Sequence, residues 1–244
     1  MMLDLKPDET ALFLDFDGTL VDLAPRPEAV TVSPALPAIL ARVQALFAGA
    51  AAVVSGRPVA DLDGFLAPFR FVANGLHGLE ARDAPDGAVV RRAPPASLDR
   101  VRQGIAASGI AATDGVLVED KALTLAVHYR QAPDAQEAVL TLLHDLAAPH
   151  ADLAVLAGKM VVEVKPSGFS KATAVEHCLT LPAFAGRRPL FVGDDVTDED
   201  GMRAALARGG AAIKVGEGPT VAPVRLGTVS DVHRFLARLA DGAA

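Results

Sequence analysis

Short apolar runs without polar alternation recur along the chain, and three of them end directly in a cluster of polar residues. Runs of this kind are typical of strands that are buried on both faces of a parallel sheet. The three runs, with the residues that follow them, are 11–14 before Asp15, 51–54 before Ser55, and 190–192 before Gly193, Asp194 and Asp195. Residues 71–73 and 212–215 are two further candidate strands.

Helical patterns separate these runs. Ser33 before Pro34 indicates the start of a helix that extends to about Phe47. The other expected core helices run from Ser170 to about Leu179, from Asp198 to Gly209, and from about Ser230 to Leu239. Strands that alternate with helices predict an α/β fold with an open, parallel, doubly wound sheet. Ligands of such sheets bind beyond the carboxyl ends of the strands, where all three polar clusters fall.

The middle of the chain has a different pattern, in which the order helix–strand–strand occurs twice after a linker-like segment at 82–96. The expected elements are a helix at 97–108, strands at 116–119 and 123–130, a helix from Asp134 to Leu146 with Asp134 and Glu137 as a capping box, and strands at 153–156 and 160–164. We therefore expect a catalytic core of residues 1–95 and 166–244, with an inserted α+β module of residues 96–165. Hinges are expected near 93–96 and 165–168.

Composition narrows the function classes. The chain has 244 residues, of which 51% are hydrophobic, and its formal net charge is −7, so neither disorder nor nucleic-acid binding is expected. The single cysteine, Cys178, excludes an internal disulfide and lies in an apolar helical pattern typical of core packing. No signal peptide and no membrane-length apolar run is evident. We expect a cytoplasmic monomer that binds a small molecule and no membrane.

The segment Asp15-Phe16-Asp17-Gly18-Thr19 is the first candidate site. Residues 15 and 17 of an extended chain point the same way, and two converging carboxylates repel each other unless a cation lies between them. A hard cation with oxygen ligands, Mg²⁺, fits that requirement. The alternative is an ordinary strand end with an Asp-Gly turn.

Three further groups offer phosphate or metal chemistry. The Ser55 hydroxyl and the N–H of Gly56 would hold phosphate oxygens, although a simple serine helix cap is the better explanation of Ser55 when it is taken alone. Lys171 in a first helical turn opposes the helix dipole, which favours a nearby anion over a plain surface lysine only in combination with other signals. Asp194 and Asp195 belong to a crowded acidic segment that needs a cation or is a solvated turn.

The joint order of these motifs, each placed against a predicted strand or helix, resembles the haloacid dehalogenase superfamily of phosphatases, with a type-two cap as the inserted module. The resemblance implies Asp15 as nucleophile, Asp17 as general acid and base, and Ser55, Gly56 and Lys171 as phosphate ligands. It implies a Mg²⁺ site made by Asp15, Asp17 through its backbone carbonyl, and Asp194, with Asp195 as a further ligand or an outer-shell acceptor.

Within that superfamily the chain resembles trehalose-6-phosphate phosphatases. The segments that carry this resemblance are 20–27, 75–80, 119–121, 128–130, 158–166 and 193–200. It implies a sugar phosphate as substrate and sugar contacts from the module by Glu119, Lys121, Lys159 and Glu163. Alternation along residues 123–130 puts Arg130 on the same polar strand face as His128, so Arg130 is a further candidate substrate contact. Lys159 and Glu163 are likewise expected to share a face of the strand at 160–164. His77 is either a ligand contact or a structural histidine.

Three other functions stay open on the sequence. The first is hydrolysis of a different sugar phosphate, such as sucrose-phosphate or mannosyl-phosphoglycerate. The second is a phosphomutase, and the third is a non-catalytic sugar-phosphate sensor. The sensor is disfavoured because such proteins usually lose a nucleophile or metal carboxylate, whereas Asp15, Asp17, Lys171 and Asp194 are all present.

Overall fold

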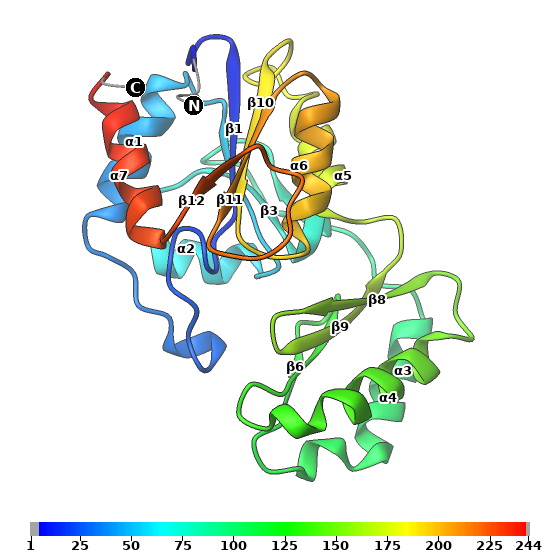
Figure 1. Cartoon of the computed structure of the whole chain (residues 1–244). Coiled ribbons are helices and arrows are strands. Elements are labelled where there is room, and N and C mark those ends of the chain that lie inside the picture. Colours follow the sequence, from blue (N-terminus) through cyan, green and yellow to red (C-terminus); the bar gives the residue numbers. More distant parts are fainter. Residues whose placement is uncertain (1–4, 243–244) are drawn as a thin grey trace. The chain divides into compact units, whose positions relative to one another are not determined.

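A computed structural model describes residues 5–242 of the chain (Figure 1). The contacts divide these residues into two compact units. The first unit contains the described residues up to Arg91 and those from Phe169 onward, and the second is Arg92–Gly168. Residues 92–95 and 166–168 thus group with the inserted module, whose expected range was 96–165. At the second boundary, the last module strand runs on through Pro166.

The first unit is built on an eight-stranded sheet with the order β12-β11-β10-β1-β2-β3-β4-β5. Its strands are β1 (Thr10–Leu14), β2 (Ala51–Val54), β3 (Val72–Gly75), β4 (Glu80–Arg82), β5 (Val90–Arg91), β10 (Arg188–Gly193), β11 (Ala211–Val215) and β12 (Val224–Leu226). Six neighbouring strands, from β12 to β3, pair in parallel, and β4 and β5 extend the sheet antiparallel. The predicted parallel sheet is confirmed, whereas β12 and the antiparallel edge lack a run of apolar residues long enough to predict.

Helices cover both faces of this sheet (Figure 1). They are α1 (Leu36–Leu46), α2 (Val59–Leu66), α5 (Lys171–Cys178), α6 (Asp198–Ala207) and α7 (Val229–Ala240). Successive residues of β1 serve opposite faces: Leu12 and Leu14 pack with α1, α2 and α7, while Ala11 and Phe13 pack with α5 and α6. Burial on both faces explains why these strands lack polar alternation.

The helix starts agree with the sequence at α5 and differ at α1. Ser170 caps α5 in a reciprocal capping box with Thr173. In contrast, α1 begins at Leu36 with Ala35 as its N-cap residue, so the predicted Ser33–Pro34 start is two residues, or about half a turn, too early. Alanine has no side-chain acceptor, and the buried residues Leu36, Leu40 and Val43 hold α1 in place through packing instead.

The second unit has a four-stranded antiparallel sheet with the order β6-β7-β9-β8. Its elements are α3 (Ser97–Ser108), β6 (Leu117–Asp120), β7 (Leu125–His128), α4 (Gln136–Ala147), β8 (Leu153–Gly158) and β9 (Val161–Pro166). The predicted order helix–strand–strand, repeated, is present. The predicted capping box is wrong, because the N-cap residue of α4 is Ala135 and residues 133–135 form a 3₁₀ turn before it.

One face of this sheet is apolar and the other is polar. Val127 and Val162 lie in a core that includes Val101 of α3 and Leu143 of α4. On the opposite face, Glu119 lies across from Ala126 and Ala126 lies across from Glu163. Directly opposed residues share a face, so both glutamates project from the side that the module helices leave uncovered.

Lys159 lies in the turn between β8 and β9 and is exposed. The prediction placed it on the strand face beside Glu163, but β9 begins only at Val161. Within residues 5–242, no helix combines the length and the apolar composition that crossing a bilayer requires.

Candidate active site

Three adjacent strands deliver the central polar residues. β1 lies between β10 and β2, with Leu14 paired to Val192 on one side and to Val53 on the other. Asp15, Ser55 and Asp194 follow the last residues of these strands, so the parallel register brings them to one edge of the sheet. This is the carboxyl edge at which doubly wound sheets bind ligands.

Lys171 holds two buried carboxylates together. Its Nζ donates to Oδ1 of Asp15 over 2.6 Å and to Oδ1 of Asp198 over 2.5 Å. Burial alone would lower the pKa of Lys171, but the charges of Asp15 and Asp198 outweigh it and raise that pKa. Lys171 is therefore a charged ammonium group at the start of α5.

Asp198 organises the acidic segment. Its Oδ2 accepts hydrogen bonds from the backbone N–H groups of Asp194 and Asp195, at 2.9 and 2.8 Å. The Nζ of the buried Lys214 donates to the backbone carbonyl of Asp194. These bonds fix the chain between β10 and α6 and aim Asp194 at Asp15.

Carboxylate oxygens of Asp15, Asp194 and Asp198 all lie within 4.8 Å of one another. Burial, together with repulsion from Asp198 and Asp194, raises the pKa of Asp15 well above its usual value, although Lys171 opposes this. The three carboxylates carry more negative charge than the ammonium group of Lys171 can balance. Their hard oxygen donors are those that Mg²⁺ prefers, so the residues present fit a divalent cation.

Gly18 makes room for one of these donors. A Cβ at this position would lie 2.3 Å from Oδ2 of Asp194, and the backbone φ of Gly18 is +78°. No other residue type tolerates both the close approach and the left-handed conformation without strain. Gly18 thus leaves the space that the carboxylate of Asp194 occupies.

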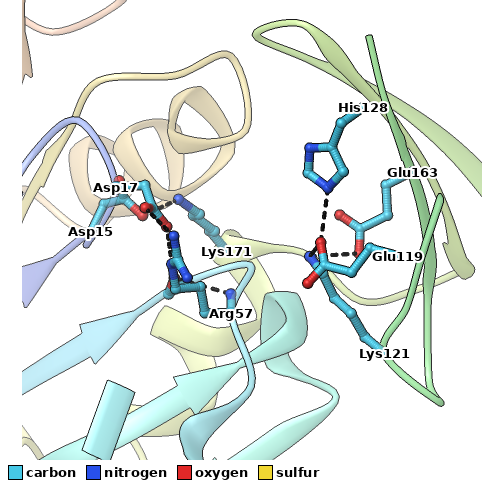
Figure 2. Close-up of polar contacts among 9 residues, drawn as sticks. Asp15, Asp17, Arg57, Glu119, Lys121, His128, Glu163 and Lys171 are labelled. Atoms are coloured by element: carbon cyan, nitrogen blue, oxygen red, sulfur yellow. Dashed lines mark hydrogen bonds and ion pairs between the residues drawn. The ribbon is translucent and has the colours of Figure 1, made fainter. Parts of the chain in front are cut away.

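Asp17 does not join the acidic cluster through its side chain. Nε and Nη2 of Arg57 donate to Oδ2 and Oδ1 of Asp17, at 2.7 and 2.8 Å (Figure 2). The pair is bidentate, which is the strong form of the arginine–carboxylate interaction. Asp17 is therefore oriented separately from Asp15, although only Phe16 lies between them in the chain.

His77 supports the segment after β2 through a backbone hydrogen bond and through the packing of its ring. The N–H of His77 donates to the carbonyl of Ser55 over 3.0 Å, and the N–H of Arg57 donates to Oγ of Ser55 over 3.1 Å. A Cβ on Gly56 would lie 2.8 Å from Nε2 of His77. The histidine is buried and its ring packs against Gly56, so it shapes the segment that presents the Ser55 hydroxyl.

A second polar cluster lies on the open face of the module sheet (Figure 2). Nζ of Lys121 is 3.8 Å from carboxylate oxygens of both Glu119 and Glu163, and Nε2 of His128 is 2.8 Å from Oε2 of Glu119. Burial would raise the pKa of Glu119, but the His128 hydrogen bond and the Lys121 charge hold it below the usual value. Arg130 instead donates from Nη2 to the carbonyl of Lys159 at 3.1 Å.

Some residues that contact the predicted site residues in the structure were not predicted to belong to the site. Asp198 was expected only as the start of a helix, and its position four residues after Asp194 was the available signal. Arg57 stands beside Ser55 and Gly56 in one motif, and His128 alternates with Arg130 along one strand face. Asp195, predicted as a metal ligand, lies outside the three-carboxylate cluster, and its Oδ1 has no hydrogen-bond partner among residues 5–242.

A largely parallel sheet has an aspartate, a lysine and acidic residues at its carboxyl edge, and an α+β module is inserted in its chain; this is the architecture of the haloacid dehalogenase superfamily of phosphatases. Among solved structures, the C-terminal domain of trehalose-6-phosphate phosphatase from C. albicans has a TM-score of 0.85 over 97% of this chain and 94% of that one, at 24% sequence identity. This likeness establishes the fold.

The sequence comparisons establish the family. The model of the trehalose-phosphatase family matches residues 13–224. A probable trehalose-phosphate phosphatase from Sinorhizobium fredii is 44% identical over 91% of this chain and 83% of its own length. The trehalose-6-phosphate phosphatase of Escherichia coli is 37% identical over 93% of this chain and 85% of its own. The chain belongs to the trehalose-phosphatase family of phosphoric monoester hydrolases.

Proposed function

We propose that this protein hydrolyses trehalose-6-phosphate to trehalose and phosphate through an aspartyl-phosphate on Asp15. The observation that carries the proposal is the buried group formed by Asp15, Lys171 and Asp198, with Asp194 within 4.8 Å. A carboxylate next to a fixed ammonium group, at the ligand-binding edge of the sheet, is suited to attack a phosphorus atom and to tolerate the charge that develops around it.

The reaction has two displacements. In the first, an oxygen of Asp15 forms a bond to phosphorus as the bond to the sugar oxygen breaks, and Asp17 gives its proton to that leaving oxygen. In the second, Asp17 takes a proton from water while the water oxygen attacks phosphorus, and the carboxylate of Asp15 is restored. The products are the free sugar and inorganic phosphate.

The phosphoryl oxygens need cationic and hydrogen-bonding partners. Lys171 supplies an ammonium group, and Ser55 with the N–H of Gly56 supplies neutral donors beside the nucleophile. Phosphoryl transfer is accelerated mainly by such positioning and charge stabilisation, and each lost stabiliser typically lowers the rate about 10²–10³-fold.

Mg²⁺ is the cation proposed for this site. Asp15, the backbone carbonyl of Asp17 and Asp194 would hold it, and Asp198 would steady Asp194 through the backbone hydrogen bonds described above. When bound, the ion would neutralise carboxylate and phosphate charge and orient the phosphoryl group. Asp195 would act as an outer acceptor.

The module is proposed to recognise the sugar. Glu119, Lys121 and Glu163 form a dense set of acceptors and donors on an open sheet face, which is the chemistry that binds several hydroxyl groups. Lys159, in the turn between β8 and β9, and Arg130, which follows β7 and donates to the carbonyl of Lys159, would also contribute. The lowered pKa of Glu119 keeps it an acceptor through the neutral and mildly acidic range.

A panel of sugar phosphates, assayed by phosphate release with and without Mg²⁺, tests the proposal. Trehalose-6-phosphate should give the highest kcat/KM, and chelation of divalent cations should abolish turnover. A higher kcat/KM for sucrose-phosphate or mannosyl-phosphoglycerate would overturn the substrate, and phosphate release that requires a sugar bisphosphate would indicate a mutase. Full activity of Asp15→Asn would overturn the mechanism.

A further inference from the structure

Both carboxylate oxygens of Asp17 are engaged by a single arginine. Arg57 donates from Nε and from Nη2, at 2.7 and 2.8 Å, so the plane of the Asp17 carboxylate is fixed as well as its position (Figure 2). The side-chain hydrogen bonds of Asp17 within residues 5–242 are these two. The guanidinium fork is thus the main restraint on this side chain.

Arg57 is itself held rigidly. Its guanidinium carbon lies 5.0 Å from the centre of the Phe65 ring and 5.7 Å from that of Phe16, and these two rings are stacked on each other. Its side chain is only 11% exposed, compared with 31% for Asp17. An arginine packed in this way retains little side-chain freedom, so its geometry is transmitted to the carboxylate that it binds.

We propose that Arg57 is the positioning residue of the acid–base step: it orients Asp17 and stabilises the carboxylate that remains after Asp17 has given its proton to the leaving oxygen. The proposal rests on the role assigned to Asp17 under the proposed function. The pair in the structure is the carboxylate form of Asp17, because both of its oxygens accept hydrogen bonds from Arg57. Asp17 reaches this form when its proton passes to the leaving sugar oxygen, and it is protonated again by the attacking water, while Arg57 stays protonated throughout.

If Arg57 has this role, the effect of its loss on the rate depends on whether the leaving group needs a proton. A sugar alkoxide leaves only with a proton, whereas p-nitrophenolate is stable enough to leave without one. The value of kcat/KM covers the steps up to departure of the leaving group, and therefore does not include the later attack of water. Comparing kcat/KM for the two kinds of ester isolates the acid step from phosphate binding, which both esters share.

The experiment compares Arg57→Lys and Arg57→Gln with the unsubstituted protein on a sugar phosphate and on p-nitrophenyl phosphate, with saturating Mg²⁺. We expect kcat/KM for the sugar phosphate to fall about 10²-fold, and kcat/KM for p-nitrophenyl phosphate to change by less than about threefold, as loss of acid catalysis requires. Arg57→Lys should also be impaired, because lysine keeps the charge and loses the fork. Asp17→Asn should show the same selectivity.

Arg82→Lys is the matched control. Arg82 is buried, pairs with Asp63 at 2.7 Å and has its guanidinium carbon 5.1 Å from the Phe71 ring centre. It is far from the acidic cluster in sequence, and none of these contacts is with a residue of that cluster. Its substitution should leave the ratio of the two kcat/KM values unchanged, even where it lowers the amount of folded protein. A parallel fall for both esters in the Arg57 variants would overturn the proposal, and so would no fall for either.

The outcome is separable from the choice of sugar. If trehalose-6-phosphate is not hydrolysed, the sugar phosphate that the panel identifies as best replaces it, and the ratio still judges Arg57. If Asp17→Asn fails to discriminate between the two esters, the role of Asp17 is wrong and the proposal for Arg57 falls with it.

Discussion

The ammonium nitrogen of Lys171 lies 2.6 Å from Oδ1 of Asp15, and their side chains are only 3% and 5% exposed. Two charged groups so far from water stabilise each other only as a pair, since either one alone would be left with its full desolvation cost. The same contact therefore serves the fold and prepares the nucleophile. The two contributions can be separated by experiment.

Lys171→Met should impair both catalysis and stability. Activity should fall about 10²–10³-fold through loss of a charge-stabilising group. Without divalent cations, the unfolding free energy should fall by about 3–5 kcal/mol, because Asp15 and Asp198 lose their buried counter-charge. Urea unfolding measures this, and added Mg²⁺ should recover part of it. Lys6→Met, at an exposed site, should change neither quantity. Unaltered unfolding of Lys171→Met would contradict the buried pair as a source of stability.

Asp198→Asn should be more damaging than Asp195→Asn. Asp198 accepts a hydrogen bond from Lys171 and holds the backbone N–H groups of Asp194 and Asp195, whereas Asp195 lies outside the three-carboxylate cluster. The Mg²⁺ concentration for half-maximal activity should rise about 10–100-fold in Asp198→Asn, as for other residues that orient metal ligands. A titration of activity with Mg²⁺ measures it. An equal or larger rise in Asp195→Asn would contradict the prediction that Asp198 contributes more to metal binding than Asp195.

Glu163→Gln should raise KM for the sugar phosphate about tenfold, equivalent to about 1.4 kcal/mol, since it weakens both the acceptor and its contact with Lys121. Activity on p-nitrophenyl phosphate, which has no sugar, should not change. The control is Glu137→Gln on α4, the helix that covers the apolar face of the same sheet. Equal losses on both substrates would argue against a sugar-binding role.

Cys178 should be inert in the folded protein. Burial raises the pKa of its thiol from 9.0 to about 12, although the hydrogen bond from Asn74 opposes the shift. A thiol reagent at pH 8 should label the protein in urea and not the native protein. Rapid labelling of native protein would show that α5 opens readily.

The same shift has a consequence at high pH. Between about pH 9 and about pH 12 the unfolded chain loses the thiol proton while the folded chain keeps it, so the unfolded state binds fewer protons and the unfolding free energy falls as pH rises. Relative to Cys178→Ala, the unsubstituted protein should lose about 1.4 kcal/mol per pH unit within that window. Parallel curves for the two proteins would contradict the raised pKa.

The parallel sheet was predictable because its strands are buried on both faces, and short apolar runs such as 11–14 signal that directly. The α5 start was predictable because Ser170 caps it through local hydrogen bonds. The start of α1 was not, because Leu36 and Leu40 fix it by packing against distant strands. Local chemistry is visible in a sequence, whereas tertiary packing is visible only in part.

The site residues can be divided in the same way, into those that were predictable from the sequence and those that were not. Asp15, Ser55, Lys171 and Asp194 stand at the ends of predicted elements, so topology alone brings them to one edge. The pairing of Asp17 with Arg57 joins residues 40 positions apart through side chains, and that of Asp198 with Lys171 joins residues 27 positions apart. Neither partner choice follows from strand order. The different contacts of the five nearby acids could therefore be learned only from the structure. These acids are Asp15, Asp17, Asp194, Asp195 and Asp198.

The module is one uninterrupted stretch, Arg92–Gly168, and its apolar residues form a cluster of their own. A gene needs only two crossover points to exchange such a stretch, and the acidic cluster on either side of it in the chain would be left untouched. A lineage built on this plan can acquire new substrates by recombination and keep its chemistry intact. The same two junctions are where a protein engineer would cut to build chimaeras.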